Sequence, residues 1–134
     1  MDLKIDKKIT LIKKRLNQSL PGWDSQKKMA VMPISPVTRL AFIPPANAKL
    51  AAVAIILFQE DNKLKFFLTR RTSNVDHHKG QISLPGGAKD EGESFEDASL
   101  RESEEEIGVN VDLDLLGELT PLYAPVSGFL IHSY

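Results

Sequence analysis

The stretch that decides the fold runs from Gly86 to Val109 and reads GGAKDEGESFEDASLRESEEEIGV. Its glycines predict a turn, and the acidic residues that follow predict a helix. Ser94 is a suitable N-cap for that helix, and Asp97 lies three residues on, in the place of a capping-box acid. Gly108 is a typical helix-ending residue. We therefore expect a Gly-rich turn that leads into an acidic helix.

Three carboxylates share one side of this helix. Glu102, Glu105 and Glu106 fall within an arc of roughly 100°, because successive helical residues are rotated by about 100°. Carboxylates on one stripe repel one another and cost stability when they are unpaired. A hard divalent cation removes the repulsion, since Mg²⁺ and Mn²⁺ prefer carboxylate and carbonyl oxygens. The alternative is an acidic face in contact with solvent alone, which is what most runs of Glu are.

The spacing across the whole stretch favours the metal site. Counted from Gly87, the order is Gly, five residues, Glu93, seven residues, Arg101-Glu102, two residues, Glu105-Glu106, one residue, Gly108 and an apolar residue. This pattern resembles the Nudix box, the signature of hydrolases that act on nucleoside diphosphates linked to another moiety. Ser103 departs from the pattern, which usually has an apolar residue there to pack on the sheet.

The Nudix resemblance implies roles for the residues of the box. The first ligands of Mg²⁺ or Mn²⁺ would be Glu105, Glu106 and the carbonyl of Gly86, with Glu102 as a further ligand or as the base. Glu102 or Glu105 would take the proton of the attacking water. Arg101 belongs to the catalytic set as a residue that holds neighbouring carboxylates in place. Glu93 either orients the Gly-rich loop or binds metal.

The segment before the box resembles a subgroup of the family, the coenzyme A diphosphatases. The resemblance rests on the LTRR stretch (68–71), His78, Gly80-Gln81 and Pro85-Gly86-Gly87, and Ser127-Gly128-Phe129 resembles a later stretch of that subgroup. It implies substrate contacts from Arg70, Arg71, His78, Gln81 and Gly87. Two positions depart, since Asp76 stands where the subgroup usually has Arg and Leu84 where it usually has Phe.

The resemblance also implies an α/β fold, a Nudix-like α/β/α sandwich around a mixed sheet, which we assign to residues 46–134. Residues 1–45 should form an N-terminal helical extension with a Pro-rich connection. Apolar residues recur at helical spacing over residues 4–19, and a short second helix should run from Asp24 or Ser25 to about Met32. We expect the first helix to dock on the body of the protein or on a second subunit, rather than on a membrane.

Patterns of apolar residues predict the strands. Residues 50–58 form a continuous apolar run, which predicts a strand buried on both faces, and residues 64–70 should complete a hairpin with it. Further strands are expected near 39–43 and over 81–84, 109–111, 115–120 and 129–134, with a polar loop over 71–79. The last run stops at Tyr134, so we expect a domain incomplete at its C-terminus, with exposed edges, self-association as a two-fold dimer and little activity.

Composition excludes several classes of protein. The 134 residues allow one domain, and their longest apolar run is too short to span a bilayer. The absence of cysteine excludes disulfides and a Cys nucleophile, and fits a cytoplasmic protein. Residues 1–88 carry 15 Lys and Arg against 6 Asp and Glu, whereas residues 89–134 carry 2 against 12. This asymmetry suits a phosphate ester held between basic side chains and metal-loaded carboxylates, and nothing favours nucleic acid as a partner.

These patterns together predict a metal-dependent hydrolase for a small nucleotide substrate. The subgroup resemblance implies cleavage of coenzyme A or its derivatives to 3′,5′-ADP and 4′-phosphopantetheine. One alternative is hydrolysis of another nucleotide diphosphate, such as ADP-ribose or a dinucleotide. A second alternative, from a different class, is a Nudix-like module that binds a nucleotide without turnover.

Overall fold

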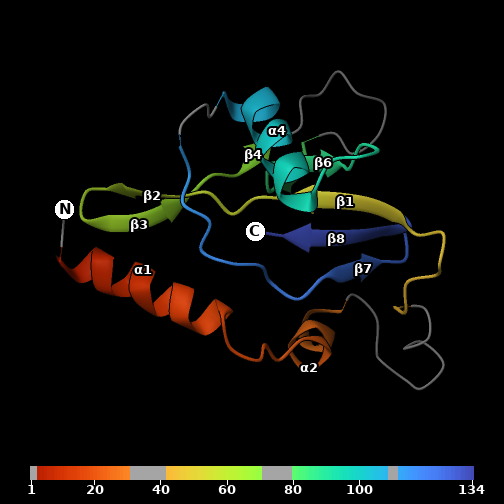
Figure 1. The fold of residues 1–134 in the computed structure, drawn as a ribbon, viewed down its shortest axis with the longest axis horizontal. Coiled ribbons are helices and arrows are strands. Elements are labelled where there is room, and N and C mark those ends of the chain that lie inside the picture. Colours follow the sequence, from red (N-terminus) through yellow and green to blue (C-terminus); the bar gives the residue numbers. More distant parts are fainter. Residues whose placement is uncertain (1–2, 31–41, 71–79, 109–111) are drawn as a thin grey trace.

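The computed structural model describes residues 3–30, 42–70, 80–108 and 112–134 (Figure 1). The helices are α1 (Leu3–Leu16), α2 (Trp23–Gln26), the 3₁₀-helix η1 (Lys27–Met29) and α4 (Phe95–Ile107). The strands are β1 (Lys49–Val53), β2 (Leu57–Glu60), β3 (Lys63–Phe66), β4 (Thr69–Arg70), β5 (Ile82–Ser83), β6 (Gly86–Ala88), β7 (Leu122–Ala124) and β8 (Phe129–Ser133).

Four strands form the main sheet, in the order β6-β1-β8-β7. β8 runs parallel to β1, whereas β6 is antiparallel to β1 and β7 is antiparallel to β8. The remaining strands form two small antiparallel ladders, β2 with β3 and β4 with β5. The predicted class, a mixed α/β fold around a mixed sheet, is confirmed.

The two faces of the main sheet differ, because side chains alternate along each strand. Ala52 pairs with Gly87 on one side and His132 on the other, and all three face α4. On this face the ring of Phe95 stacks on His132, with centroids 3.7 Å apart. Ala51 and its partner Ile131 face away from α4.

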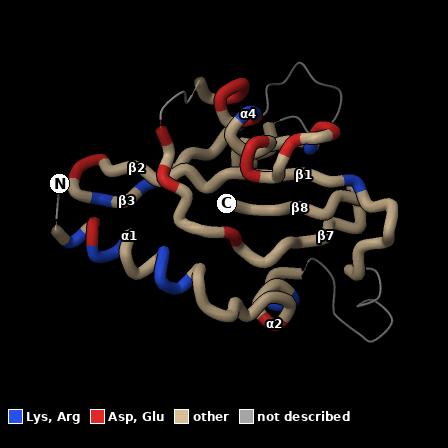
Figure 2. The backbone as a smooth tube through the Cα atoms, in the orientation of Figure 1, with Lys and Arg blue, Asp and Glu red and all other residues tan. Residues whose placement is uncertain are grey.

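The N-terminal extension packs on the rest of the chain, as predicted. Ile5 is buried, and a Cβ at Gly117 would lie 2.7 Å from Cβ of Leu16, so α1 lies directly against this backbone. The amide of Gln26 donates to the carbonyls of Thr120 and Pro121, each at 3.1 Å. Lys and Arg residues recur along α1, whereas α4 and the loop before it are rich in Asp and Glu (Figure 2).

Both helices of the extension differ from their predicted bounds. The first ends at Leu16 rather than at residue 19, and the second begins at Trp23, before Asp24 or Ser25. Gly22 occupies the position before α2, with φ of 50°, a conformation that glycine adopts without steric cost. No helix in the described ranges is long and apolar enough to cross a membrane.

The apolar run 50–58 is not one strand, so this prediction was wrong. β1 ends at Val53, and β2 begins at Leu57 in a separate ladder. Ala54 and Ile56, which lie between the two strands, are buried, and the backbone N–H of Ala54 donates to the carbonyl of Pro85. Because the chain passes from one sheet to the other inside the core, no polar residue in the sequence indicates the break. The predicted hairpin turn is present, now between β2 and β3.

Three further strand predictions need correction. The expected turn at Pro85-Gly86-Gly87 contains β6, a strand of the main sheet. Residues 115–120 are not a strand, and the short β7 follows them. β8 is present as predicted but is not an edge, because β1 and β7 pair with its two sides. The argument for a dimer from an unpaired last strand is therefore wrong. The second helical segment ends with η1 at Met29, and Ala30 is extended, so the predicted end near Met32 is wrong. Residues 42–43 of the predicted strand 39–43 are not in a strand, and the predictions for 39–41, 71–79 and 109–111 lie outside the described residues.

Candidate active site

Helix α4 is fixed at both ends by the residues that the sequence indicates. The hydroxyl of Ser94 accepts a hydrogen bond from the backbone N–H of Asp97 at 3.0 Å and donates to its carboxylate at 2.6 Å. Gly108 ends the helix with φ of 69°, and its N–H donates to the carbonyl of Glu104 at 2.9 Å. These caps satisfy backbone groups that a helix leaves open, so the orientation of the acidic side chains along α4 is well defined.

Small residues bring α4 close to the sheet. Ala98, Ser99 and Ser103 are buried against it. The hydroxyl of Ser103 donates to the carbonyl of Ser99 at 2.7 Å, so its burial leaves no polar group unsatisfied. Ser103 therefore packs on the sheet where the family pattern has an apolar residue, with its hydroxyl turned back to the helix.

Two glycines of β6 receive side chains from α4. A Cβ at Gly87 would lie 2.5 Å from the carboxyl carbon of Glu102, a distance that real Cβ atoms do not tolerate. The neighbouring Gly86 donates its backbone N–H to Oε2 of Glu106 at 3.4 Å. The carboxylates of Glu102 and Glu106 therefore lie against the backbone of β6. A larger residue in place of Gly87 would displace the carboxylate of Glu102.

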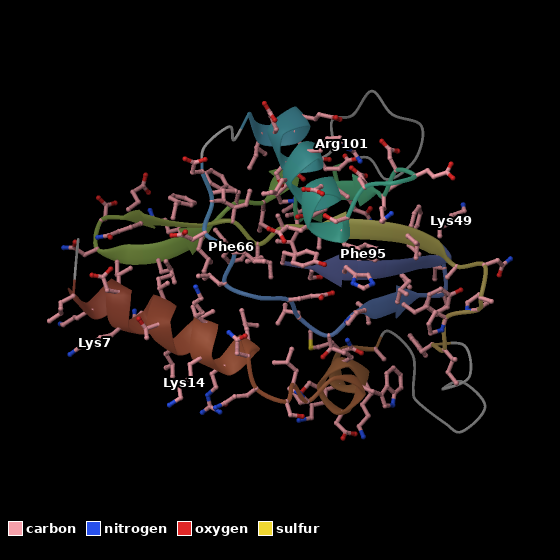
Figure 3. All side chains as sticks on the ribbon, in the orientation of Figure 1. Lys7, Lys14, Lys49, Phe66, Phe95 and Arg101 are labelled. Carbon is pink, nitrogen blue, oxygen red and sulfur yellow. The ribbon has the colours of Figure 1, made fainter. Side chains whose placement is uncertain are left out.

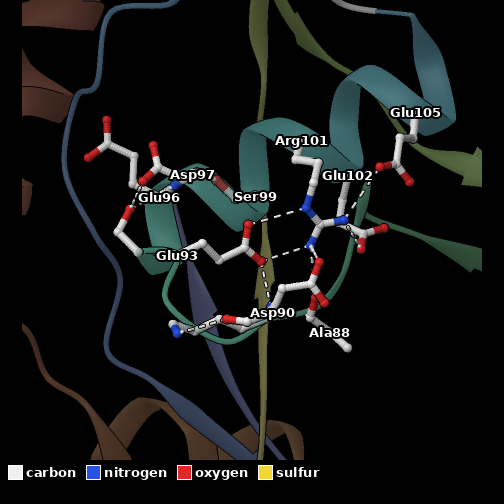
Figure 4. Close-up of polar contacts among 11 residues, drawn as sticks. Ala88, Asp90, Glu93, Glu96, Asp97, Ser99, Arg101, Glu102 and Glu105 are labelled. Atoms are coloured by element: carbon white, nitrogen blue, oxygen red, sulfur yellow. Dashed lines mark hydrogen bonds and ion pairs between the residues drawn. The ribbon is translucent and has the colours of Figure 1, made fainter.

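Arg101, in the middle of α4, is the centre of an ion-pair network that joins the helix to the loop before it (Figure 4). Its Nε and Nη2 donate to the two carboxylate oxygens of Glu93, at 3.2 and 2.8 Å. Its Nη1 donates to Oε1 of Glu102 at 2.8 Å, and Nη2 also donates to the carbonyl of Ala88 at 3.1 Å. Glu105 lies at the edge of this network, with Oε1 3.5 Å from Nη1.

The network shifts the pKa values of its members. The hydrogen bonds from Arg101, and then the backbone N–H of Asp90, lower the pKa of Glu93 to about 2. In turn, the hydrogen bonds of Arg101 to Glu93, and then to Glu102, raise the pKa of Arg101 above its usual range. Glu93 accepts the N–H of Asp90 at 2.6 Å, so it ties the Gly-rich loop to the helix. Of the two predicted alternatives for Glu93, this geometry matches the orienting one.

The cleft beside β6 collects residues from several elements. It has a volume of about 520 Å³. Its residues from β1 and β8 belong to the face of the main sheet away from α4, and Gly87 and Glu106 border it at the edge strand β6. Its walls include Arg70 of β4, Gly86 and Gly87 of β6, Glu106 of α4, and Phe129 and Ile131 of β8. A cation, a carboxylate and half-buried glycine backbone thus line the cleft together with apolar side chains, which suits an anionic ligand with a flat or apolar part.

The predicted site residues are only partly brought together. Arg70, Gly86, Gly87 and Glu106 line the cleft, and Glu102 lies against Gly87. Gln81 is exposed and does not contribute to this lining. Arg71 and His78 lie outside the described residues. Sequence reasoning placed Phe129 only in a resembling stretch and did not assign Ile131, although their alternation on β8 could have indicated a shared face.

Comparison with known proteins identifies the family. Residues 48–131 match the family model of the NUDIX domain. The chain belongs to the Nudix family. Nudix hydrolases act on diphosphate bonds and generally use divalent metal ions.

Curated relatives agree with this family. Nudix hydrolase 3 of Caenorhabditis elegans is 35% identical over 94 residues, which cover 69% of this chain and 39% of the relative. Nudix hydrolase 15, mitochondrial, of Arabidopsis thaliana is 39% identical over 92 residues, 61% of this chain and 32% of the relative. A peroxisomal coenzyme A diphosphatase of Caenorhabditis elegans is 37% identical over 87 residues, 61% of this chain and 37% of the relative. The matched segments thus span well under half the length of these relatives.

The donor chemistry of the Nudix box fits a hard divalent cation. Glu102, Glu105 and Glu106 supply carboxylate oxygens within one turn of α4, beside the backbone of β6. Among the described residues, no three Asp, Glu or His side chains converge on a single point. Arg101 instead contacts Glu102 and lies near Glu105, whose side chain is 62% exposed. Glu102 and Glu106 thus lie against the backbone of β6, and Arg101 offsets part of the charge of Glu102 and Glu105.

Proposed function

We propose that this Nudix chain hydrolyses the diphosphate bond of coenzyme A or its derivatives, with Mg²⁺ or Mn²⁺ as cofactor. The observation that carries the proposal is the cleft in which Arg70, the glycine backbone of β6 and Glu106 meet. The matching family model supports the class of reaction. The LTRR stretch with His78 and Gly80-Gln81, and the name of one relative, support coenzyme A as the substrate.

The reaction adds one water across a phosphoanhydride. The water oxygen forms a bond to one phosphorus as the bridging P–O bond breaks, and the products are 3′,5′-ADP and 4′-phosphopantetheine. Glu102, Glu105 and Glu106, with the carbonyl of Gly86, would hold the cation. When bound, such a cation polarises phosphoryl oxygens and lowers the pKa of water.

The chain's own residues supply the remaining steps. Glu102 or Glu105 takes the proton from the attacking water. The Glu102 carboxylate lies beside Gly87 of β6, and the Glu105 carboxylate lies near Arg101. Arg70, which lines the cleft, balances the charge of the diphosphate, with Arg71, His78 and Gln81 as further substrate contacts. Arg101 acts as a positioning residue, because its guanidinium is engaged by Glu93, Glu102 and the carbonyl of Ala88.

A product screen tests the proposal. Coenzyme A, ADP-ribose and diadenosine polyphosphates are incubated with this chain and with any longer form, each with Mg²⁺ and with Mn²⁺, and products are separated by chromatography. Release of 3′,5′-ADP from coenzyme A, at a higher rate than cleavage of the other substrates, supports the proposal. Faster release of AMP from ADP-ribose or a dinucleotide would move the chain to the first alternative. Binding of nucleotides without turnover in any form would favour a binding module.

Two smaller proposals accompany this one. A cytoplasmic location stays a prediction, since the names of relatives include mitochondrial, chloroplastic and peroxisomal proteins. A homodimer also stays a prediction, supported by the exposed apolar side chains of Leu115 and Leu119 and of Leu122 in the edge strand β7. Sedimentation at several protein concentrations distinguishes a dimer from a monomer.

A further inference from the structure

The floor of the cleft ends in an aromatic ring with a cation beside it. Phe129 of β8 lines the cleft, and Nζ of Lys49 lies 5.5 Å from the centre of its ring. Lys49 and Phe129 are direct partners in the parallel pairing of β1 and β8. Both therefore lie on the cleft face of the sheet, in register with each other. Figure 3 places Lys49 at the start of β1.

The Lys49 ammonium has no carboxylate partner in the part of the chain that the structure describes: no Asp or Glu there lies within ion-pair distance. Lys49 is exposed, and its Nζ lies over the ring of Phe129. A cation over an aromatic face is weakly held, because the attraction at an exposed site is small. It remains available to a stronger anionic ligand.

A second Lys–Phe pair on the opposite face shows the contrast. Nζ of Lys89 lies 5.6 Å from the ring centre of Phe95, whose ring also stacks on His132. The Phe95 ring is therefore used inside the fold, between α4 and β8. Among the described rings, none stacks on Phe129, so its ring can contact a ligand in the cleft.

The position of this pair along the sheet suits one end of a nucleotide. Gly86, whose N–H contacts Glu106, pairs with Val53, and Lys49 lies four residues earlier on β1. Four residues of strand span roughly 13 Å. A diphosphate placed at Gly86 and Glu106 would therefore leave its nucleoside to extend along the sheet toward Phe129 and Lys49.

We propose that Phe129 and Lys49 form the nucleoside end of the cleft, where Phe129 packs on adenine and Lys49 binds a phosphate on the 3′-oxygen of the ribose. The ligand class is a 3′-phosphorylated adenosine nucleotide. The inference rests on the proposed function for the position of the diphosphate, and it deepens that function by naming the residue that selects substrates with the 3′-phosphate over those without it.

Binding of two nucleotides tests the inference without turnover. Calorimetry compares adenosine 3′,5′-bisphosphate with adenosine 5′-monophosphate on the unchanged chain, on Lys49→Met and on Lys49→Arg. The unchanged chain should bind the bisphosphate roughly tenfold more tightly, the effect of one exposed charge-assisted contact. Lys49→Met should abolish this preference and leave the monophosphate affinity unchanged, whereas Lys49→Arg should keep the preference.

Lys89→Met is the matched control, because it removes the same kind of Lys–Phe contact from the other face of the sheet. It should retain the preference for the bisphosphate. Phe129→Leu should weaken both nucleotides to a similar extent, since the ring contacts the base and not the phosphate. Circular dichroism establishes that each variant is folded before it is compared.

The possible outcomes separate this inference from the proposed hydrolysis. A preference that survives in Lys49→Met, the absence of any preference in the unchanged chain, or no binding of either nucleotide overturns the inference, whatever the turnover. Turnover of coenzyme A together with an unchanged preference in Lys49→Met overturns the inference alone. A preference that Lys49→Met abolishes, without turnover in this chain or in any longer form, supports the inference and overturns the proposed hydrolysis.

Discussion

The carboxylate of Glu102 lies so close to Gly87 that no side chain fits between them: a Cβ at Gly87 would lie 2.5 Å from both the carboxyl carbon and Oε2 of Glu102. The glycine is in β6 and the glutamate is in α4, so their contact fixes how closely the acidic helix approaches the sheet. Because the clash involves the end of a flexible side chain, an added carbon would move the carboxylate rather than the strand.

Gly87→Ala should therefore separate activity from stability. The displaced Glu102 carboxylate should lower turnover about 100-fold, the scale of a misplacement of about 1 Å at a catalytic group. The free energy of unfolding should change by less than about 1 kcal/mol, since no unusual backbone angle is required at this position. Turnover and thermal unfolding, measured on the same preparation, check both parts.

Gly108→Ala provides the opposite pattern. Gly108 has φ of 69° and no neighbour within 4 Å of an added Cβ, so the substitution costs backbone strain of roughly 1 kcal/mol and moves no site residue. Stability should fall while turnover is retained. Equal losses of turnover in the two variants would contradict the role that we assign to the Gly87–Glu102 contact.

The carboxylates of α4 should bind the divalent cation. Glu105→Gln and Glu106→Gln each remove one charged oxygen ligand and should weaken Mn²⁺ binding roughly tenfold or more, as disturbance of a metal site typically does. The fold should survive, because the loss of a negative charge relieves repulsion within the cluster. Calorimetric titration with Mn²⁺ measures the affinity, and urea unfolding measures the stability.

Glu104→Gln is the control for charge. Glu104 is next to Glu105 in sequence, but it points about 100° away from it on the helix, and it is exposed. It should therefore leave the Mn²⁺ affinity within about twofold, since it removes a charge without removing a predicted ligand. The same loss of affinity in all three variants would show a nonspecific acidic surface and contradict the metal site.

Helix α4 could be predicted from sequence because its signals are local. The cap at Ser94, the stop at Gly108 and the spacing of three carboxylates all lie within one continuous segment, and the structure agrees with the caps. β6 could not be predicted as a strand, because two of its three residues are glycines and carry no side chains to show alternation. The break in the run 50–58 is hidden for a similar reason, since both sides of it are buried and apolar.

The cleft depends on contacts between distant parts of the chain. Arg70 and Phe129 both line it although they lie 59 positions apart in the sequence, and no local pattern predicts that they share a cleft. The place of β8 between β1 and β7 is likewise a property of the sheet topology. The sequence of residues 129–134 predicts a strand but not its neighbours, so the expected exposed edge was wrong.

The link between Arg101 and Glu93 should make stability depend on pH in acid. Arg101 and the N–H of Asp90 lower the pKa of Glu93 from its ordinary value of 4.5 to about 2. A lowered pKa means that the folded state binds the proton less readily than the unfolded state. This contribution to stability is therefore present above about pH 4.5 and is lost as the pH falls toward 2.

Unfolding in urea between pH 2 and pH 6 measures this effect. Because other carboxylates titrate in the same range, the comparison is between the unchanged chain and Glu93→Gln. The stability advantage of the unchanged chain should be largest near pH 6 and should disappear near pH 2. In Arg101→Gln, the NMR-detected pKa of Glu93 should rise toward its usual range. A pKa that stays near 2 would show that the backbone N–H of Asp90 suffices.

Ser103 should tolerate a smaller side chain and not a larger one. Its side chain is buried between α4 and the sheet, and its hydroxyl donates to the carbonyl of Ser99 inside the same helix. Ser103→Ala removes this hydrogen bond but improves helix propensity, so the free energy of unfolding should change by less than about 1 kcal/mol.

Ser103→Leu places an apolar residue where the family pattern usually has one, in a space that this chain fills with Ser. Overpacking of that kind should cost roughly 1–3 kcal/mol and lift α4 from β6, which would also move Glu102 away from Gly87. The free energy of unfolding, measured in urea, and the turnover rate should therefore both fall in Ser103→Leu, and both should remain near their original values in Ser103→Ala. If Ser103→Leu were more stable than the unchanged chain, the helix would have room against the sheet, and the close packing of α4 on β6 would be contradicted.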